Sequence, residues 1–467
     1  MQGSFEARTE QAPVAGRFGR VSRRIILLLA ILLIVPLGNQ SLAAQVGDSG
    51  PQVTIIQAGH MLDRPGSEPK GPSSIVIAEG KIIEVAEGYI ERPNSKIVDL
   101  RDRFVMPGLI DTHVHITFEF SPSLRSAFAE RNPADFVLAG TVYANRTLQA
   151  GFTTVRDLGS PSGVALSLRD AIEAGRVAGP TVLAAGQMIS ATAGHADLRG
   201  FNTLTAAGAR ENYVGVTCDG PAECMKRVRE QARAGADVIK LAVTGGVLSD
   251  SKAGLSLQMV DDEVGAAVTA AHQQGLRVAA HAHSKSGIEA ALSAGVDSIE
   301  HGSFLDNASA ALFKRSGAYL VPTLTAVTGA AEQARMEKLS PEMAEKALSA
   351  HQAATTGVRI AVSKDIPIAF GTDSGITPHG QNAREFELLV SAGLSPSEAI
   401  ASATTIAAAL LGRSDRIGTI EVGKDADLIA VDGNPTVNIG LLSNVIFVMR
   451  RGAIHRLEGR PVAFSAR

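Results

Sequence analysis

The chain of 467 residues is poor in aromatic residues and cysteine, and it has no long basic stretch. Aromatic residues make up 4% of it, and no basic or aromatic-rich stretch stands out, which argues against a nucleic-acid partner. The sequence contains no internal repeat and no low-complexity stretch. Hydrophobic residues at 45% and charged residues at 19% describe an ordinary globular chain with a large core.

Cysteine is almost absent, since Cys218 and Cys224 are the only two. They are not expected to bind a metal, because no other thiol is available. In an oxidising compartment they can form a disulfide. Two free thiols near a helix start are the alternative, and the sequence leaves this choice open because it does not give the geometry.

The longest apolar run near the N-terminus, from Ile25 to Leu37, has 13 residues, which is short for a membrane span. Arginines precede it, and the small residues around Ala43 suit cleavage, so residues 1–43 are predicted to be a signal peptide. Arg23 and Arg24 also resemble a twin-arginine signal. We expect an exported, periplasmic or secreted protein with no stable membrane span in the mature chain; an uncleaved N-terminal anchor is the alternative.

The most informative segment that is present is PGLIDTHVH, residues 107–115. The apolar run Phe104-Val105-Met106 leads into it and predicts a short strand. His113 and His115 are two positions apart, so on an extended chain their side chains point the same way. Two imidazoles aimed at one point make half of a metal site. One buried and one exposed histidine near a strand end is the alternative.

Four later apolar runs each carry further candidate ligands. Helix-like segments lie between them, such as residues 261–275, which have apolar residues at helical spacing and Gly275 as a stop signal. Alternating strands and helices predict a parallel sheet with crossovers. The runs are residues 236–243 with Lys240, 277–283 with His281 and His283, 297–302 with His301, and 368–374 with Asp373.

The spacing of these residues predicts an α/β fold of the (β/α)8 TIM-barrel type. Lys240 and His281 are 41 residues apart, and His281 and His301 are 20 apart, each one strand–helix unit. Strands expected at 151–158, 181–189 and 319–324 bring the count to eight, starting at Phe104. In such a barrel the chemistry collects at the C-terminal strand ends, where all the candidate ligands fall. Short strand-like segments at both chain ends, joined by turns such as Glu79-Gly80, predict antiparallel pairing.

Together the motifs PGLIDTHVH, GFTTVRDLG, ADVIKLAVTGG, VAAHAHS, SIEHG and FGTDSG resemble the amidohydrolase superfamily. Within it, the chain is similar to the imidazolonepropionase-like and Xaa-Pro dipeptidase branch, which has ochratoxinase-like relatives. The resemblance covers roughly residues 52–460. It implies a TIM barrel over residues 104–414, a small discontinuous β-sandwich built from 52–103 and 415–460, and assembly as a homo-oligomer.

The resemblance also implies a binuclear centre of two divalent metal ions, usually zinc. An ammonium on Lys240 would be repelled by two cations, whereas its carbamate, formed with carbon dioxide, is an anion with two oxygens. A lysine that reaches out from a strand end is the alternative, and for Asp373 the alternative is a helix N-cap. The implied roles are His113 and His115 on one ion, His281 and His301 on the other, Lys240 bridging both, and Asp373 binding metal and transferring protons.

Four further residues have weaker assignments. His195 is a candidate for polarising the substrate carbonyl, against an ordinary loop histidine. His283 could be a ligand, a substrate contact or a support for the ligands. Arg156 could meet a substrate carboxylate, but an internal ion pair with Asp157 or another rim carboxylate is at least as well supported. His379 is expected to line the pocket.

The expected reaction is cleavage of an amide bond that releases a C-terminal amino acid from a dipeptide or an N-acyl amino acid, including ochratoxin-type aryl amides. Three alternatives remain at this point. A cyclic amide or lactone hydrolase would use the same metals. A mononuclear deaminase is less favoured, because Lys240 suits a bridged pair. A catalytically inactive barrel could serve as a binding module, although the intact ligand set argues against it.

Overall fold

The computed structural model describes residues 53–121, 123–197, 213–249 and 252–466. The chain divides into two units, Met1–Ser49 and Gly50–Arg467, and all described residues belong to the second. The predicted signal peptide, residues 1–43, lies outside the described residues. No helix within the described ranges is both long enough and apolar enough to cross a membrane.

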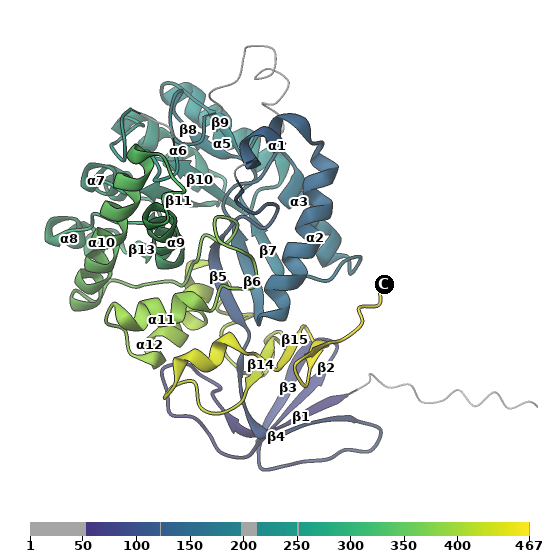
Figure 1. The fold of residues 1–467 in the computed structure, drawn as a ribbon. Helices are drawn as coiled ribbons and strands as arrows, with labels where there is room; N and C mark the ends of the chain where they lie inside the picture. Colours follow the sequence, from purple (N-terminus) through teal and green to yellow (C-terminus); the bar gives the residue numbers. More distant parts are fainter. Residues whose placement is uncertain (1–52, 122, 198–212, 250–251, 467) are drawn as a thin grey trace, which may run out of the picture. The chain divides into compact units, whose positions relative to one another are not determined.

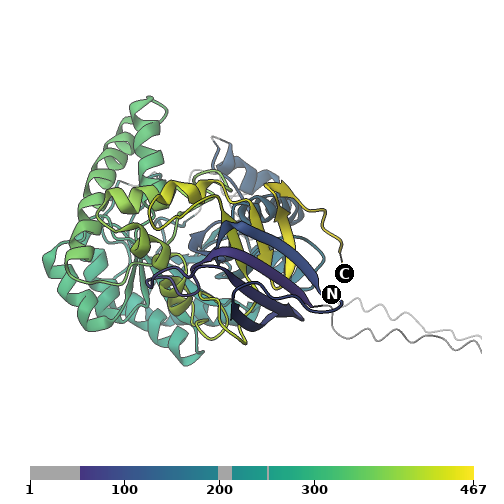
Figure 2. The same cartoon turned by 90° about the horizontal axis from the view of Figure 1, so that it is seen from below.

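Both ends of the second unit contribute to one eight-stranded sheet, of order β17-β16-β15-β14-β4-β1-β2-β3. Figure 2 shows the N-terminal strands in purple beside the C-terminal strands in yellow. Neighbours pair antiparallel, except that β1 and β4 run parallel. The strands are β1 (Thr54–Met61), β2 (Ser73–Ala78), β3 (Lys81–Glu87), β4 (Lys96–Pro107), β14 (Leu428–Val431), β15 (Phe447–Arg450), β16 (Ala453–Leu457) and β17 (Arg460–Pro461).

The turn expected at Glu79-Gly80 joins β2 to β3. Both residues have positive φ, 51° and 77°, which is the backbone of the tight turns that match the twist of a hairpin. One face of the sheet is buried by a core cluster of its own that includes Ile56, Ile75 and Leu428. The two chain ends therefore meet in a single hydrogen-bonded sheet.

The rest of the chain alternates parallel strands with helices, and the helices surround the strands (Figure 1). The strands form two parallel sheets, of order β5-β6-β7 and β13-β12-β11-β10-β8-β9. Their bounds are β5 (Leu109–Val114), β6 (Phe152–Asp157), β7 (Thr181–Ala184), β8 (Met188–Ser190), β9 (Gly215–Thr217), β10 (Val238–Ala242), β11 (Arg277–Ala282), β12 (Ser298–His301) and β13 (Tyr319–Val321).

Shorter pairings link the two parallel sheets on both sides. Residues 366–374 lie between β13 and β5, through parallel bridges from Ile368 to Leu320 and from Ser374 to Val114. On the other side, the backbone N–H of Asp237, just before β10, donates to the carbonyl of Ala184 at the end of β7, at 2.8 Å. The strand ends that carry the candidate ligands therefore face a common region.

Two strands differ from the sequence-based expectation. Phe104 to Met106 was expected to begin the barrel, but these residues end β4 and pair with β14. Gly108 then separates β4 from β5, and it packs so closely that a Cβ there would lie 2.2 Å from Oγ1 of Thr153. The single strand expected at 181–189 is divided into β7 and β8, because Gly186 turns the chain at φ 72°.

The helices begin and end at the expected kinds of residue. The helix expected from residue 261 is α6, and its buried face includes Val264, Ala267 and Ala271. Ser284 caps the next helix, α7, which Gly295 ends in the left-handed conformation. The helices are α1 (Leu124–Glu130), α2 (Pro133–Gln149), α3 (Val164–Glu173), α5 (Pro221–Ala234), α6 (Asp261–Gln273), α7 (Lys285–Ala294), α8 (Asn307–Ser316), α9 (Leu324–Arg335), α10 (Pro341–Ser363), α11 (Arg384–Ser391), α12 (Pro396–Ser402) and α13 (Thr405–Leu410).

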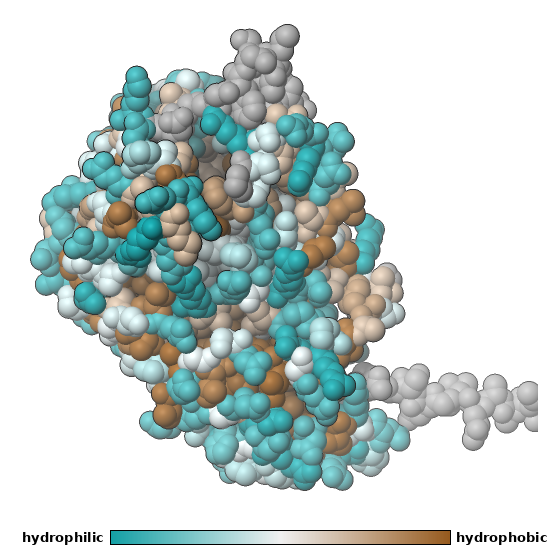
Figure 3. Space-filling model, in the orientation of Figure 1, coloured by the Kyte–Doolittle hydropathy of each residue, from teal (hydrophilic) through white to brown (hydrophobic). Residues whose placement is uncertain are grey.

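Polar side chains cover most of the face shown in Figure 3, and apolar ones gather where α11 and α12 approach the eight-stranded sheet. The strands and helices of the parallel part bury one large core, to which Phe152, Ile239 and Phe370 belong. This core holds the strand ends in fixed positions, and the site is built on them.

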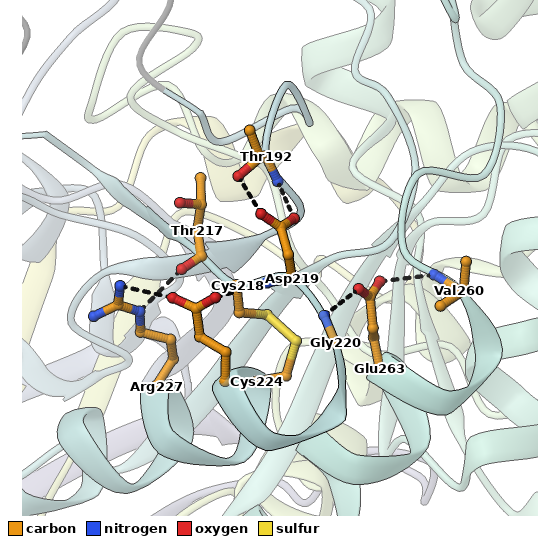
Figure 4. Close-up of a disulfide and its surroundings, with 10 residues drawn as sticks. Thr192, Thr217, Cys218, Asp219, Gly220, Cys224, Arg227, Val260 and Glu263 are labelled. Atoms are coloured by element: carbon orange, nitrogen blue, oxygen red, sulfur yellow. Dashed lines mark hydrogen bonds and ion pairs between the residues drawn. A yellow bond between two sulfur atoms is a disulfide. The ribbon is translucent and has the colours of Figure 1, made fainter.

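Cys218 and Cys224 form a disulfide, which answers the question that the sequence left open (Figure 4). It closes the short loop between β9 and α5. Asp219 in this loop accepts hydrogen bonds from the backbone N–H and the hydroxyl of Thr192, at 3.1 and 2.7 Å. The N–H of Gly220 donates to Glu263 of α6 at 2.7 Å. The bridged loop is therefore tied both to α6 and to the turn that leads to His195.

Candidate active site

All the residues that the sequence predicted as metal ligands line one cavity of about 80 Å³. They come from the middle of β10, from the C-terminal ends of β5, β11 and β12 or the residue just after, and from the segment between β13 and β5. A parallel α/β fold brings such positions together at one edge. The lining residues that were singled out from the sequence are His113, His115, Lys240, His281, His301 and Asp373, together with His195 and His283.

His113 and His115 turn one ring nitrogen outward and the other toward Asp373. The outward Nδ1 of His113 lies 2.8 Å from Oε2 of Glu300, and that of His115 donates to the carbonyl of Gly159 at 2.7 Å. The inward Nε2 atoms lie 3.5 and 3.2 Å from Oδ1 of Asp373. Outer hydrogen bonds of this kind fix the tautomer and orientation of metal-binding histidines. The pair can therefore offer two nitrogens, with Asp373, to one ion.

A second group consists of His281, His283 and His301. Their candidate ligand atoms lie within 4.8 Å of one another, and so do those of His113, His301 and Asp373. Thr323 holds Nδ1 of His301 at 2.7 Å, and the hydroxyl of Ser303 holds Nδ1 of His283 at 2.8 Å.

His281 has the opposite orientation. Its Nε2 donates to the carbonyl of Gly245 at 3.2 Å, which leaves Nδ1 as its available ligand atom. Burial, above all, lowers the pKa of His281 and His301 well below the ordinary value, and lowers the pKa of His283 to about 3. Neutral imidazole is the form that binds metal.

Lys240 is a buried residue whose side-chain nitrogen lacks a binding partner in the described protein part of the site. Its side chain is buried, and its Nζ atom has no hydrogen-bond partner among the described residues. Burial lowers the pKa of Lys240 to about 8, although Glu300 and Asp373 oppose that shift. An unpaired buried ammonium is costly. Burial also lowers the pKa of His113, to about 4, whereas Asp373 outweighs burial at His115 and raises its pKa. The orphaned nitrogen and the histidines that burial keeps neutral fit a site for divalent metal ions.

Arg156 lies outside the cavity, which removes it as a substrate contact. Its side chain is buried, Nη2 lies 3.0 Å from Oε1 of Glu300, and Nε donates to the carbonyl of Thr112 at 2.6 Å. The internal ion pair is therefore the alternative that the structure supports, with Glu300 as its partner. Asp157 instead accepts the backbone N–H of Ile116 at 2.7 Å.

Glu300 is the functional residue that the sequence reasoning missed. Burial would raise the pKa of its carboxyl group, but Arg156 and His113 outweigh burial and bring it to about 2. Glu300 is therefore a carboxylate that orients His113. An acidic residue inside the apolar strand of SIEHG, directly before a histidine, was the available signal.

His195 lies against the second group of histidines. Its ring stacks on that of His281, with 4.3 Å between the ring centroids. Its Nδ1 is hydrogen-bonded to the hydroxyl of Ser249, and its backbone N–H donates to Gln258 at 2.8 Å. The turn after β8 thus places this ring in the cavity wall, where it can contact a substrate.

His379 does not occupy the pocket position expected for it. It is buried outside the cavity, and its Nε2 contacts the backbone carbonyls of His115 and Phe118 at 3.2 and 3.1 Å. Its ring stacks on Tyr143. His379 therefore supports the chain segment after β5.

Three residues at the site have a backbone conformation that residues other than glycine rarely adopt. The φ angles are 69° for His301, 59° for Asp373 and 48° for Thr323. Such conformations cost on the order of 1–3 kcal/mol each and tend to cluster at functional sites. Here they direct the ring of His301 and the carboxylate of Asp373 into the cavity, and they place the hydroxyl of Thr323 against Nδ1 of His301.

Comparison with known proteins agrees with this geometry. Residues 104–457 match the model of the amidohydrolase family. Ochratoxinase from Aspergillus niger is 32% identical over 411 residues, which cover 83% of each chain.

Solved structures give the same result. A Xaa-Pro dipeptidase with methionine bound in its active site superposes with a TM-score of 0.81 at 39% identity, over 87% of this chain and 100% of the other. The crystal structure of A. niger ochratoxinase superposes with a TM-score of 0.77 at 28% identity, over 87% of this chain and 96% of the other. The chain therefore belongs to the amidohydrolase family, in the branch of ochratoxinase and the Xaa-Pro dipeptidases, and is a metal-dependent hydrolase that acts on carbon–nitrogen bonds.

Proposed function

We propose that this amide hydrolase is binuclear and releases a C-terminal amino acid from a dipeptide or an N-acyl amino acid. The observation that carries the proposal is the convergence of histidines, Lys240 and Asp373 on one buried cavity. The names of the relatives support the substrate class. One is a Xaa-Pro dipeptidase that holds methionine, a free amino acid, in its active site.

In this proposal two divalent ions, zinc in the first place, occupy the ligand cluster. His113 and His115 would hold one ion and His281 and His301 the other, and Lys240, as a carbamate, would supply anionic oxygen ligands. His283 stands within reach of the second ion as a further ligand or a substrate contact. When bound, the pair of ions supplies Lewis acidity for the substrate carbonyl and lowers the pKa of water.

The chain's own residues orient the substrate and move the proton. The carboxylate of Asp373, beside Nε2 of His115, takes a proton from water and passes it to the departing amine, as a general base and then a general acid. When the hydroxyl of Ser249 donates to Nδ1 of His195, Nε2 carries the ring proton and donates it to the substrate carbonyl oxygen. Leu248, Val327 and other apolar residues in the cavity wall limit the access of bulk water.

The same proposal extends to the architecture. We infer that the two parallel sheets and residues 366–374 together form one (β/α)8 barrel, because hydrogen bonds link the sheets on both sides. We also propose that the protein is exported, as the N-terminal sequence predicts; the disulfide between Cys218 and Cys224 is consistent with an oxidising compartment. Homo-oligomer assembly remains a prediction from the resemblance.

The test is release of free amino acid by the zinc-loaded protein from Xaa-Pro, Xaa-Arg or Xaa-Lys dipeptides and from aryl-acyl-phenylalanine. We expect release from at least one class, lost on chelation and restored by zinc. Two bound metals with no release from any substrate would contradict the proposal and favour cyclic amide or lactone hydrolysis. A protein that binds no metal at all would favour a binding module.

A further inference from the structure

A cavity of about 180 Å³, called the basal cavity below, lies at the opposite end of the parallel strands from the candidate metal site. Thr154 lies near the start of β6 and Thr181 begins β7, and both line this cavity. Most candidate metal ligands instead lie at or just after the C-terminal ends of their strands. Other walls come from α3, from the chain after α13 and from the turn between β15 and β16. No described residue lines both cavities, so amide hydrolysis does not account for the basal cavity.

Two buried groups on the wall of the basal cavity lack a hydrogen-bond partner. The side chain of Thr154 is fully buried, and its Oγ1 has no partner among the described residues. The Nε atom of Arg451 is buried and has none there either. Oδ2 of Asp425 lies 3.7 Å from this atom, which is beyond hydrogen-bond distance. Both groups can donate a hydrogen bond, and nearly all buried polar groups in proteins are paired. We therefore expect this wall to bind an acceptor.

All four carboxylates that line the basal cavity already have a cationic partner. The pairs are Asp170 with Arg169 at 2.9 Å, Asp237 with Arg169 at 2.7 Å, Asp425 with Arg416 at 2.8 Å and Glu173 with Arg451 at 2.6 Å. Arg413 also lines the cavity, and its exposed guanidinium has no ion pair or hydrogen bond in the described part of the chain. A cationic ligand would have to displace one of the pairs, whereas an anion meets the free guanidinium of Arg413. The charge arrangement therefore favours an anion.

The size of the basal cavity and the kind of donor narrow the class of anion. One ordered water needs on the order of 10–15 Å³, so about 180 Å³ leaves room for a small polyatomic group. The planar fork of a guanidinium matches the paired oxygens of a carboxylate or a phosphate. A hydroxyl such as that of Thr154 adds a single donor to one oxygen.

We propose that the basal cavity is a second ligand site, which binds a small oxyanion with the chemistry of phosphate or a carboxylate. Arg413 meets the charge of the anion, and the hydroxyl of Thr154 and the Nε–H of Arg451 donate to its oxygens. This inference does not rest on the proposed amide hydrolysis, because no group of the metal-ligand cavity takes part in it.

Two substitutions remove donors from the basal cavity without touching the metal ligands. Arg413→Gln removes the free charge at an exposed position. Thr154→Val removes the hydroxyl and keeps the branched shape of the side chain. Without ligand, Thr154→Val should not lower the thermal unfolding midpoint, because it deletes an unpaired hydroxyl and no hydrogen bond. The matched control is Arg359→Gln on α10, where an exposed arginine without an ion pair in the described part of the chain lines neither cavity.

The experiment titrates the zinc-loaded proteins with inorganic phosphate, and separately with acetate, in a calorimeter at constant ionic strength. We expect the unmodified protein to bind at least one of the two anions at millimolar concentration. Arg413→Gln and Thr154→Val should each weaken that binding by roughly tenfold, the loss expected for one hydrogen bond to a charged group. Arg359→Gln should bind as the unmodified protein does.

The outcomes separate the basal cavity from the metal ions, which can bind phosphate themselves. Binding that both cavity variants weaken supports the proposal, and preference for phosphate or for acetate then identifies the class of oxyanion. Binding that all variants retain equally would place the anion on the metal ions and overturn the proposal. No binding of either anion would overturn it as well, since the basal cavity would then hold only water.

Discussion

His113 directs its Nδ1 atom to the buried carboxylate of Glu300, at a distance of 2.8 Å. The other oxygen of this carboxylate meets Arg156. The guanidinium keeps Glu300 ionised, and the ionised carboxylate holds the ring of His113 so that Nε2 points at the cavity. A charge pair inside the fold thus fixes the orientation of a candidate metal ligand at β5.

The first prediction concerns the pH dependence of stability. The pKa of Glu300 is about 2 in the folded protein, against an ordinary value of 4.5, so the group stabilises the native state above pH 4.5. That contribution, on the order of 3 kcal/mol, is lost as the pH falls from 4.5 toward 2. We expect the unfolding free energy of Glu300→Gln to vary less with pH in this window. Denaturant unfolding of both chelated proteins measures it, and parallel pH profiles would contradict it.

A second prediction separates two roles of Glu300, its charge balance with Arg156 and its orientation of the His113 ring. Arg156→Leu leaves the buried Glu300 unpaired, and breaking such a pair typically costs about 3–5 kcal/mol. Arg156→Leu combined with Glu300→Leu should be more stable than Arg156→Leu alone, because no buried charge is left. The double variant should nevertheless bind metal more weakly, since Nδ1 of His113 then loses the carboxylate that orients its ring. Unfolding curves and metal titrations measure the two effects; a double variant with normal metal affinity would reject the orienting role of Glu300.

The third prediction tests proton transfer by Asp373. Asp373→Asn preserves the size of the side chain and one oxygen, so the fold and most metal binding should remain. Turnover should fall by roughly 10²–10⁴-fold, the usual contribution of a general acid–base group. Metal content, thermal unfolding and kcat are measured on the same sample. Full activity in this variant would remove Asp373 from the proton path.

The fourth prediction concerns the chemical state of Lys240. We expect chelated protein to regain activity with zinc only when bicarbonate is present, because the carbamate must form again. Lys240→Ala should lose metal and activity, and a short carboxylic acid such as acetate should restore part of both. Lys240→Arg serves as the control that keeps the charge and cannot form the same carbamate. Recovery of full activity in carbon dioxide-free buffer would contradict the carbamate.

The fifth prediction concerns the disulfide. Replacing Cys218 and Cys224 together with serine should lower stability by about 2 kcal/mol, the value expected for a short closed loop. It should also lower kcat/KM, because Asp219 in that loop holds Thr192, three residues before His195. Asp219→Ala, with the disulfide intact, should reproduce the kinetic effect alone. Unchanged kinetics in both variants would show that the turn is held by other contacts.

Local sequence was enough to locate most of the site. The histidine pairs and Asp373 could be identified because each stands at the end of a short apolar run, and in alternating strands and helices such ends share one edge. His379 follows the last of these runs in the same way, yet it packs beneath the segment after β5. Sequence position alone does not tell which face of a loop is turned to the cavity.

The contact between Glu300 and Arg156 could not be predicted from the spacing of residues in the sequence. They lie 144 positions apart, and their contact depends on β6 and β12 presenting both side chains to the same interior. Burial then decides their charge state, because only a paired arrangement makes two ions tolerable away from water. The packing of Phe118, Phe128 and Tyr213 is of the same kind, since these residues belong to separate segments that meet only in the folded chain.

The sequence by itself therefore determined the family, the order of most strands and helices, and the residues that meet at the candidate metal site, because these depend on local periodicity and on motif spacing. The tertiary structure decided that Phe104 belongs to the eight-stranded sheet, that Cys218 and Cys224 are bridged, and which partner orients each histidine. The physical reason is that these outcomes depend on distances between residues remote in the chain, and only packing sets those distances.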